Sequence, residues 1–184
     1  MPEAFPTQEH LLEVALQDAP TVTPAGVRCA KVPEGVRIRE LVVHTDERGT
    51  ICELLDPRWG WGDAPLVYAY SFTIRPGWAK GWAMHKGHED RYCILSGEMK
   101  VVLYDARPDS STLGLVSEIY MTEQRRAVVS IPPGVWHADE NVGTGDVLGV
   151  NFPTRPYEHE HPDKYCLPLH NDLIPYRFKH AKGC

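Results

Sequence analysis

Several features that would assign the chain to a functional class at once are missing from its sequence. No run approaches the about 18 consecutive apolar residues that a membrane-spanning helix needs, so no membrane span is expected. The five cysteines form no C-x-x-C pair, which argues against a disulfide framework or a zinc knuckle and favours reduced thiols. No basic tract occurs, and the formal net charge is −6. Nucleic acid is therefore not expected as a partner.

Residues 1–20 have neither a basic start nor an apolar stretch of signal-peptide length, so we expect a cytoplasmic location. A length of 184 residues suits one domain with a well-formed core. The hydrophobic share of 42% and the charged share of 24% are typical of a globular protein.

The hydrophobic periodicity changes once along the chain. Residues 7–18 carry leucines and alanine at helical spacing after Thr7, which predicts a short capped helix. From residue 36 onward, short runs of β-branched and aromatic residues alternate with Gly, Pro and Asp clusters. These runs predict strands within 36–44, 50–56, 66–74, 91–97, 98–106, 115–122, 127–132 and 146–153. About eight strands and almost no helix predict an all-β jelly roll, with a tight turn at Ser96-Gly97.

We divide the chain into an N-terminal extension over residues 1–35, a β-barrel domain over 36–155 and a C-terminal tail over 156–184. The tail is polar and irregular, so it is expected to pack on the barrel rather than to fold alone. Its run YEHEHPDKY (residues 157–165) is rich in metal-binding side chains, but no strand would hold them in place. We interpret it as a solvated or subunit-contact loop.

The stretch IPPGVWHADEN carries a spaced signature. Pro132, Gly134, His137 and Asn141 follow the order P-x-G-x-x-H-x-x-x-N. This order resembles the second signature of the cupin superfamily, whose fold is a double-stranded β-helix of the jelly-roll type. The resemblance therefore implies the same fold class that the strand pattern predicts, here with a short N-terminal helical extension.

The first cupin signature has two histidines, then an acid, then six residues and a glycine. Counting back from Gly97 places Asp90 at the acid and His85 at the second histidine, whereas Ala83 takes the place of the first. Two imidazoles and one carboxylate can hold a divalent metal ion as a facial triad, which makes His85, Asp90 and His137 an alternative metal site. The other interpretation is a metal-free polar pocket in which the three residues are hydrogen-bonded.

Four more stretches narrow the resemblance. DERGTICE, KGWAMH, YDARPDSSTLG and TEQRRAVVSIPPGVWHAD together resemble the dTDP-4-dehydrorhamnose 3,5-epimerase family, over residues 36–176. Its members are cupins without a metal or other cofactor, in which a histidine removes protons next to the carbonyl of a 4-keto sugar. The resemblance implies a nucleotide-linked sugar as the ligand and a homodimer that exchanges an edge strand.

The family's motifs transfer only in part. Arg48 and Glu53 match its D-x-R-G-x-x-x-E strand, so the resemblance implies that Arg48 contacts the nucleotide phosphates. Lys80 stands where the family has the arginine of its R-G-x-H motif, and Ala83 stands where the family has its catalytic base. Asp90 takes the place of a family lysine, with a basic residue beside it.

Other positions follow from the same resemblance. The position of the tyrosine that acts as the acid in the family falls near Asn151 in this sequence. His137 matches a histidine of the family's pocket, and Asp172 matches the aspartate that supports the base. The residues expected to bind the substrate are Arg48, Glu53, Lys80, Arg91, Asn151 and Tyr157.

Alanine carries no proton, so the standard base is lost at Ala83. His85 lies two positions on, and in a strand its side chain would point to the same side. It could act as the base, because histidine titrates near neutral pH, as a metal ligand, or as a structural hydrogen-bonding residue. The neighbouring His88 and Glu89 are expected to be solvated loop residues.

Three functional hypotheses follow. The favoured one is an isomerase of a nucleotide-linked 4-keto deoxysugar, in which His85, supported by Asp172, takes the proton and His137 stabilises the enolate. The second is a metal-dependent cupin enzyme that uses the alternative metal site. The third is a non-catalytic sugar-nucleotide-binding protein that has lost its base at Ala83.

Overall fold

The structure of the protein is a computed structural model that describes residues 5, 7–61, 66–179 and 181–183. The chain divides into two compact units, residues 1–31 and residues 32–184. In the first unit, helix α1 spans Gln8–Val14 and is shorter than predicted, because Ala15 is already extended. Thr7 caps the helix, since its hydroxyl accepts a hydrogen bond from the main-chain N–H of His10 at 3.3 Å. None of the described helices is long and apolar enough to cross a membrane.

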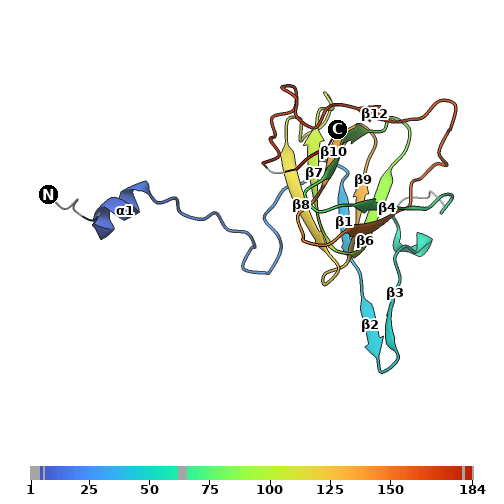
Figure 1. Ribbon diagram of the computed structural model, residues 1–184, viewed down its shortest axis with the longest axis horizontal. Coiled ribbons are helices and arrows are strands. Elements are labelled where there is room, and N and C mark those ends of the chain that lie inside the picture. The colour runs from blue at the N-terminus through green and yellow to red at the C-terminus, as the bar shows by residue number, and fades with distance from the viewer. Residues whose placement is uncertain (1–4, 6, 62–65, 180, 184) are drawn as a thin grey trace. The chain divides into compact units, whose positions relative to one another are not determined.

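The regular secondary structure of the second unit is almost entirely antiparallel strands, most of which form two five-stranded sheets (Figure 1). The first sheet contains, in spatial order, β1 (Arg37–Glu40), β9 (Ala127–Ile131), β6 (Asp90–Ser96), β11 (Val147–Asn151) and β4 (Tyr70–Ile74). The second contains β12 (Tyr165–Cys166), β5 (Ala79–Met84), β10 (Val135–Asn141), β7 (Glu98–Asp105) and β8 (Val116–Thr122). The all-β prediction is confirmed.

Besides the two-residue strand β12, two strands of the second sheet, β5 and β10, are absent from the strands predicted by periodicity. Both carry polar and small side chains where a half-buried strand would have apolar ones. They pair with each other, His137 lying opposite Ala83 and Asp139 opposite Lys80, with an irregularity between the two pairs.

The predicted tight turn is present, but it does not close a hairpin. Strand β6 ends at Ser96 and β7 begins at Glu98, yet the two strands belong to different sheets. Gly97 between them has φ 89°, and a Cβ atom there would lie 2.7 Å from the carbonyl oxygen of Asp146. Glycine fits this turn because it adopts positive φ without a steric penalty.

Alternate residues of β7 enter two separate hydrophobic cores, because successive strand side chains point to opposite faces. Met99, Val101 and Leu103 join the core of the two facing sheets. Val102 joins a second core with Trp82, in which apolar residues of the C-terminal tail take part. The tail residues of this second core are Leu169, Ile174, Phe178 and Ala181. The second sheet is thus covered on both faces.

Main-chain hydrogen bonds attach the C-terminal tail to β5. The N–H of Leu167 donates to the carbonyl of Trp82 at 3.0 Å, and the N–H of Ala79 donates to the carbonyl of Lys182 at 2.7 Å. Tail residues therefore contact β5 near both of its ends.

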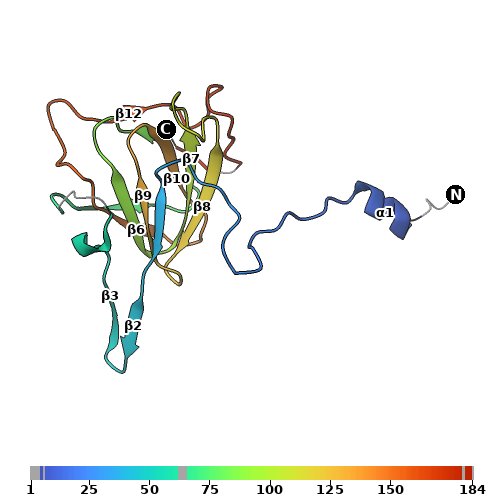
Figure 2. The same cartoon turned by 180° about the vertical axis from the view of Figure 1, so that it is seen from behind.

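A two-stranded hairpin of β2 (Val43–Asp46) and β3 (Gly49–Cys52) extends away from the two sheets, as Figures 1 and 2 both show. The short 3₁₀ helix η1 (Pro57–Trp59) follows it. Several apolar side chains on and before the hairpin are exposed, among them Val42, Val43 and Ile51. The hairpin carries Arg48 in its turn.

Candidate active site

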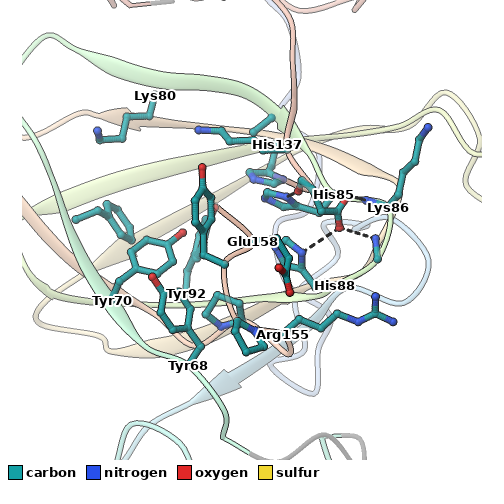
Figure 3. A pocket seen from close by; sticks show the side chains of 18 of the residues that line it. Tyr68, Tyr70, Lys80, His85, Lys86, His88, Tyr92, His137, Arg155 and Glu158 are labelled. Atoms are coloured by element: carbon teal, nitrogen blue, oxygen red, sulfur yellow. Dashed lines mark hydrogen bonds and ion pairs between the residues drawn. The ribbon is translucent and has the colours of Figure 1, made fainter. Parts of the chain in front are cut away.

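A cavity of about 950 Å³ is lined by residues from both sheets, a volume that suits a small-molecule ligand. Strands β4 and β6 of the first sheet and β5 and β10 of the second contribute to its lining. The turn at residues 85–88 and the loop at residues 153–164 complete it. Figure 3 shows the labelled histidines gathered on one side and the labelled tyrosines on the other.

Three histidines of the cavity surround one buried carboxylate. Asp90 Oδ2 lies 3.1 Å from His85 Nε2 and 3.6 Å from His137 Nε2, and Asp90 Oδ1 lies 3.6 Å from His88 Nε2. The side chain of Asn151 donates to Asp90 Oδ1 at 2.7 Å. Burial opposes ionisation of Asp90, but the hydrogen bonds from His85 and His88 outweigh it, so the pKa lies well below its usual range.

His85 directly follows β5 and has an acceptor at each ring nitrogen. Nδ1 bonds the main-chain carbonyl of Asp163, and Nε2 faces Asp90. Burial disfavours the imidazolium, yet the hydrogen bond and charge of Asp90 and the carbonyl of Asp163 more than offset it. The pKa of His85 is therefore raised above its ordinary value.

His137 lies on β10 and is buried more deeply than His85. Burial lowers its pKa to about 4, against the opposing charge of Asp90. Its Nδ1 faces the carbonyl of Val135 at 3.4 Å. The cluster thus combines histidines whose pKa values move in opposite directions, a pattern typical of functional sites.

Asp163 attaches the loop at residues 153–164 to the histidine turn. Its carboxylate accepts hydrogen bonds from the main-chain N–H groups of Lys86 at 2.9 Å and Gly87 at 2.7 Å. The same carboxylate lies 3.1 Å from His88 Nδ1. The run YEHEHPDKY, which we had interpreted as a solvated or subunit-contact loop, thus supplies residues that line the cavity.

Asp139 on β10 also lines the cavity. Its Oδ1 atom is buried and has no hydrogen-bond partner among the described residues. Burial, followed by the negative charge of Asp90, raises the pKa of Asp139 to about 8, although Lys80 and Lys164 oppose the shift.

The rest of the lining joins cations to aromatic rings. The cationic residues are Lys80, Lys86, Arg155 and Lys164. The aromatic wall consists of Tyr68, Tyr70, Phe72 and Tyr92. Cations suit phosphate oxygens, and aromatic faces suit a nucleobase or a sugar ring.

Some residues predicted from the sequence lie in or beside this cavity. Lys80, His85, His137 and Tyr157 line it. Asn151 acts behind them, because it holds Asp90 and its side-chain oxygen accepts from a main-chain N–H of β6.

Other predicted residues lie elsewhere. The guanidinium of Arg91 is bonded to Glu89 and to the carbonyl of Trp61. Glu89, expected to be solvated, is partly buried and also pairs with Arg37. Neither Arg91 nor Glu89 is part of the cavity lining.

Three further predicted residues are also outside the lining. Arg48 pairs with Asp46 on the hairpin, and Glu53 follows the hairpin strand. Asp172 is 99% exposed and pairs with Arg177, so it does not contact His85. Asp90 and Asp163 occupy the supporting positions that the resemblance implied for Asp172.

The sequence-based interpretation missed Asp139, His88 and Asp163. Asp139 follows His137 by two residues on a strand, so the alternation of strand side chains could have found it. His88 was interpreted as a solvated loop residue, but its side chain is only 15% exposed and contacts both Asp90 and Asp163. No local signal identifies Asp163, because its partners lie 75–78 residues earlier in the chain.

Comparison with known proteins places the chain in a family. Residues 44–165 match the family described as the polysaccharide biosynthesis C-terminal domain. The probable low-salt glycan biosynthesis epimerase Agl13 of Haloferax volcanii is 32% identical over 134 residues, which are 72% of this chain and 86% of that relative. The spore coat polysaccharide biosynthesis protein SpsL of Bacillus subtilis is 30% identical over 149 residues, 79% of this chain and 95% of that relative.

Solved structures share the fold at lower sequence identity. A dTDP sugar isomerase from Desulfovibrio desulfuricans has a TM-score of 0.74 at 23% identity, covering 80% of this chain and 94% of that one. A dTDP-6-deoxy-D-glucose-3,5-epimerase from Legionella pneumophila has a TM-score of 0.71 at 16% identity, covering 82% and 84%. The predicted cupin fold is confirmed. The chain belongs to the polysaccharide biosynthesis C-terminal domain family and has the cupin fold of the dTDP-4-dehydrorhamnose 3,5-epimerases.

Proposed function

We propose that the protein is an isomerase that epimerises a nucleotide-linked 4-keto deoxysugar by proton transfer at a carbon next to the ketone. The observation that carries the proposal is the histidine–carboxylate cluster at one side of a ligand-sized cavity. The name of the relative Agl13 describes an epimerase, and the names of the similar structures describe a dTDP sugar isomerase and an epimerase bound to dTDP-4-keto-L-rhamnose.

The chemistry follows from the carbon acid. A ketone acidifies the neighbouring C–H, so a base can remove that proton if the developing enolate is stabilised. We assign the proton transfer to His85, because the main-chain carbonyl of Asp163 holds Nδ1 and Asp90 stabilises the imidazolium that forms. Nε2 is the nitrogen that takes the proton, and it must turn from Asp90 to the substrate to do so. His137 is the candidate for stabilising the enolate oxygen. A proton delivered to the opposite face of the carbon inverts the centre, and Tyr70, on the aromatic wall across from the histidines, is the candidate donor. Solvent then reprotonates Tyr70 and takes the proton from His85.

Binding of the nucleotide is supported by the cations in the cavity lining. Lys80, Arg155 and Lys164 form no ion pair or hydrogen bond to another side chain within the described residues, so they are available to phosphate oxygens. The aromatic wall offers faces for the base or the sugar. A phosphate contact from Arg48 stays a prediction, because Arg48 lies on the hairpin and is not part of the lining of this cavity.

A second candidate is a metal-dependent enzyme at the same cluster, and one observation favours it. His85, His88 and Asp90 each offer a ligand atom within 4.8 Å of the others. Nδ1 of each of the three histidines faces an oxygen acceptor, the arrangement that orients metal-binding imidazoles. The residues therefore fit a divalent ion held by His85, His88 and Asp90, with His137 beside them. Such an ion would polarise the ketone as a Lewis acid.

Solvent deuterium exchange tests the proposal. The unmodified protein is expected to incorporate deuterium next to the ketone of a dTDP-4-keto-6-deoxyglucose probe, and His85→Ala should lose this exchange while still binding free dTDP. A chelator leaves the exchange intact if the histidine acts alone and stops it if a metal takes part. Binding of the probe without exchange and without metal would instead establish the non-catalytic sugar-nucleotide-binding protein.

We also propose that the protein acts in the cytoplasm as a homodimer. The exposed apolar residues on and before the β2–β3 hairpin support pairing, because a second copy would cover them. Sedimentation of the unmodified protein beside an Ile51→Lys variant tests the dimer. The variant is expected to sediment as a monomer, and two monomeric samples would contradict the proposal.

A further inference from the structure

Asp139 differs from Asp90, the buried acid beside the cavity, in that no described residue partners its carboxyl group. The residue is only 5% exposed and lies two positions after His137 on β10. Within the described part of the chain it accepts no hydrogen bond and forms no ion pair, and its Oδ1 atom is buried without a partner. Asp139 nevertheless belongs to the cavity lining, and strand alternation points its side chain to the same side as that of His137.

A buried carboxyl group without a partner destabilises the folded state, because it loses its hydration and gains no hydrogen bond. Lys80 stands opposite Asp139 in the strand register and lines the same cavity, yet the two side chains do not form an ion pair. The fold therefore keeps Asp139 at a free-energy cost. Buried polar groups that cost folding free energy occur mainly at functional sites, where they contact a ligand.

We infer that Asp139 is a specificity-determining residue that accepts a hydrogen bond from a hydroxyl or amide N–H group on the sugar ring of the ligand. The inference rests on the proposed function and adds the contact that selects among sugars. A carboxyl group accepts such a bond in either protonation state, so the role does not depend on its ionisation.

The position of Asp139 indicates that it contacts the sugar of the ligand rather than the nucleotide. It lies on the same strand as His137, whose side chain belongs to the cluster that we assign to the reacting carbon. A sugar that lacks the donor leaves the buried oxygen unpaired, and a site built on such a contact discriminates strongly against that sugar.

Calorimetric titration tests the inference, with UDP-N-acetylglucosamine and dTDP-glucose as sugar probes and free UDP and dTDP as nucleotide probes. Asp139→Val is expected to lower the affinity for the better-bound sugar probe about tenfold or more while leaving that for the free nucleotide unchanged. Asp139→Asn should retain part of the affinity, because its amide oxygen still accepts. Asp109→Val, at an exposed aspartate outside the cavity, is the matched control and should bind like the unmodified protein.

Thermal unfolding without ligand separates recognition from a structural role. Asp139→Val should melt at the same temperature as the unmodified protein or higher, because it removes a buried group without a partner. An equal loss of affinity for the sugar probe and the free nucleotide, or a lower melting temperature, would assign Asp139 to the scaffold and overturn the inference.

Two other outcomes distinguish this inference from the proposed function. If the unmodified protein binds a sugar probe and Asp139→Val binds it equally well, the inference fails and the proposed function stands. If the unmodified protein binds neither sugar probe nor free nucleotide, the proposed function fails, and the role of Asp139 fails with it.

Discussion

Asp105 and Asp139 are both buried carboxyl groups of the second sheet, on the neighbouring strands β7 and β10, yet their surroundings are opposite. Asp105 accepts hydrogen bonds of 2.6–2.8 Å from the side chains of Arg107, Ser110 and Thr112. Asp139 accepts none within the described residues. The first carboxylate organises the loop that follows its strand, whereas the second is left free to face the cavity.

The pKa values of the two groups express the same difference. Burial raises the pKa of Asp105, but the hydrogen bonds from its three neighbours outweigh burial and hold the pKa well below its ordinary value of 3.8. Burial without such bonds raises the pKa of Asp139 to about 8. Burial alone thus does not reveal whether an acid belongs to the scaffold or to the site, because its hydrogen bonds decide.

The largest expected effect is the loss of the bonded carboxylate. Asp105→Ala removes the buried carboxylate that Arg107, Ser110 and Thr112 share as an acceptor, so the free energy of unfolding should fall by about 3 kcal/mol. Urea unfolding at neutral pH measures the change, and Asp109→Ala on the same loop should leave the midpoint unchanged. A decrease of less than about 1 kcal/mol in the free energy of unfolding would show that Asp105 does not stabilise the fold in this way.

The same carboxylate should make stability depend on pH. The folded-state pKa of Asp105 is depressed, so its contribution is fully present above its unfolded value of about 3.8 and is lost as the pH falls below that value toward the folded-state pKa. Asp105→Asn carries no charge, and its unfolding free energy should therefore change less between pH 5 and pH 2 than that of the unmodified protein. Parallel curves for the two proteins would contradict the assignment.

An intermediate effect is expected at Asp163, which is partly buried and holds the histidine turn through its carboxylate. Asp163→Ala should lower the free energy of unfolding by about 1–2 kcal/mol, the magnitude of a lost hydrogen bond to a charged group. It should also speed trypsin cleavage after Lys164, because the loop loses its attachment to residues 86–88. Asp163→Asn keeps one acceptor oxygen and is the matched control. Equal cleavage rates in all three proteins would show that the carboxylate does not hold the loop.

The smallest effect is expected at Asp172, whose side chain is 99% exposed. Ion pairs at such exposed positions contribute little to stability, so Asp172→Ala should unfold with the same midpoint as the unmodified protein. Deuterium exchange at the carbon next to the ketone should also be unaffected, because Asp90 contacts His85 instead. A large loss of exchange would restore the supporting role that the sequence resemblance implied.

The strands and the cupin signatures were accessible from the sequence because both depend on local spacing. Alternation of side chains fixes which residues of a strand face the interior, and the spacing around His85, Asp90 and His137 brought these three residues together correctly. Strands β5 and β10 could not be predicted from the periodicity, because the residues at their inward positions are polar or small, as the cavity requires.

Contacts between distant segments could not be predicted in this way. Asp163 reaches the histidine turn from 75–78 residues further along the chain, through a loop without any periodicity. The contact between Asp172 and His85 that the resemblance implied is absent for a related reason. A family motif fixes an approximate position in the chain, but the neighbouring Arg177 decides where that carboxylate points.

The attachment of the C-terminal tail to β5 bears on the order in which the site forms during synthesis. The outer face of Trp82 is covered by residues that follow Leu167, and the main chain of Ala79 bonds Lys182. These tail residues leave the ribosome after strands β1–β11, so a nascent chain exposes those strands before the tail can cover Trp82 and bond Ala79. We therefore expect β5, on which the cavity depends, to become native only after the chain has emerged as far as Lys182.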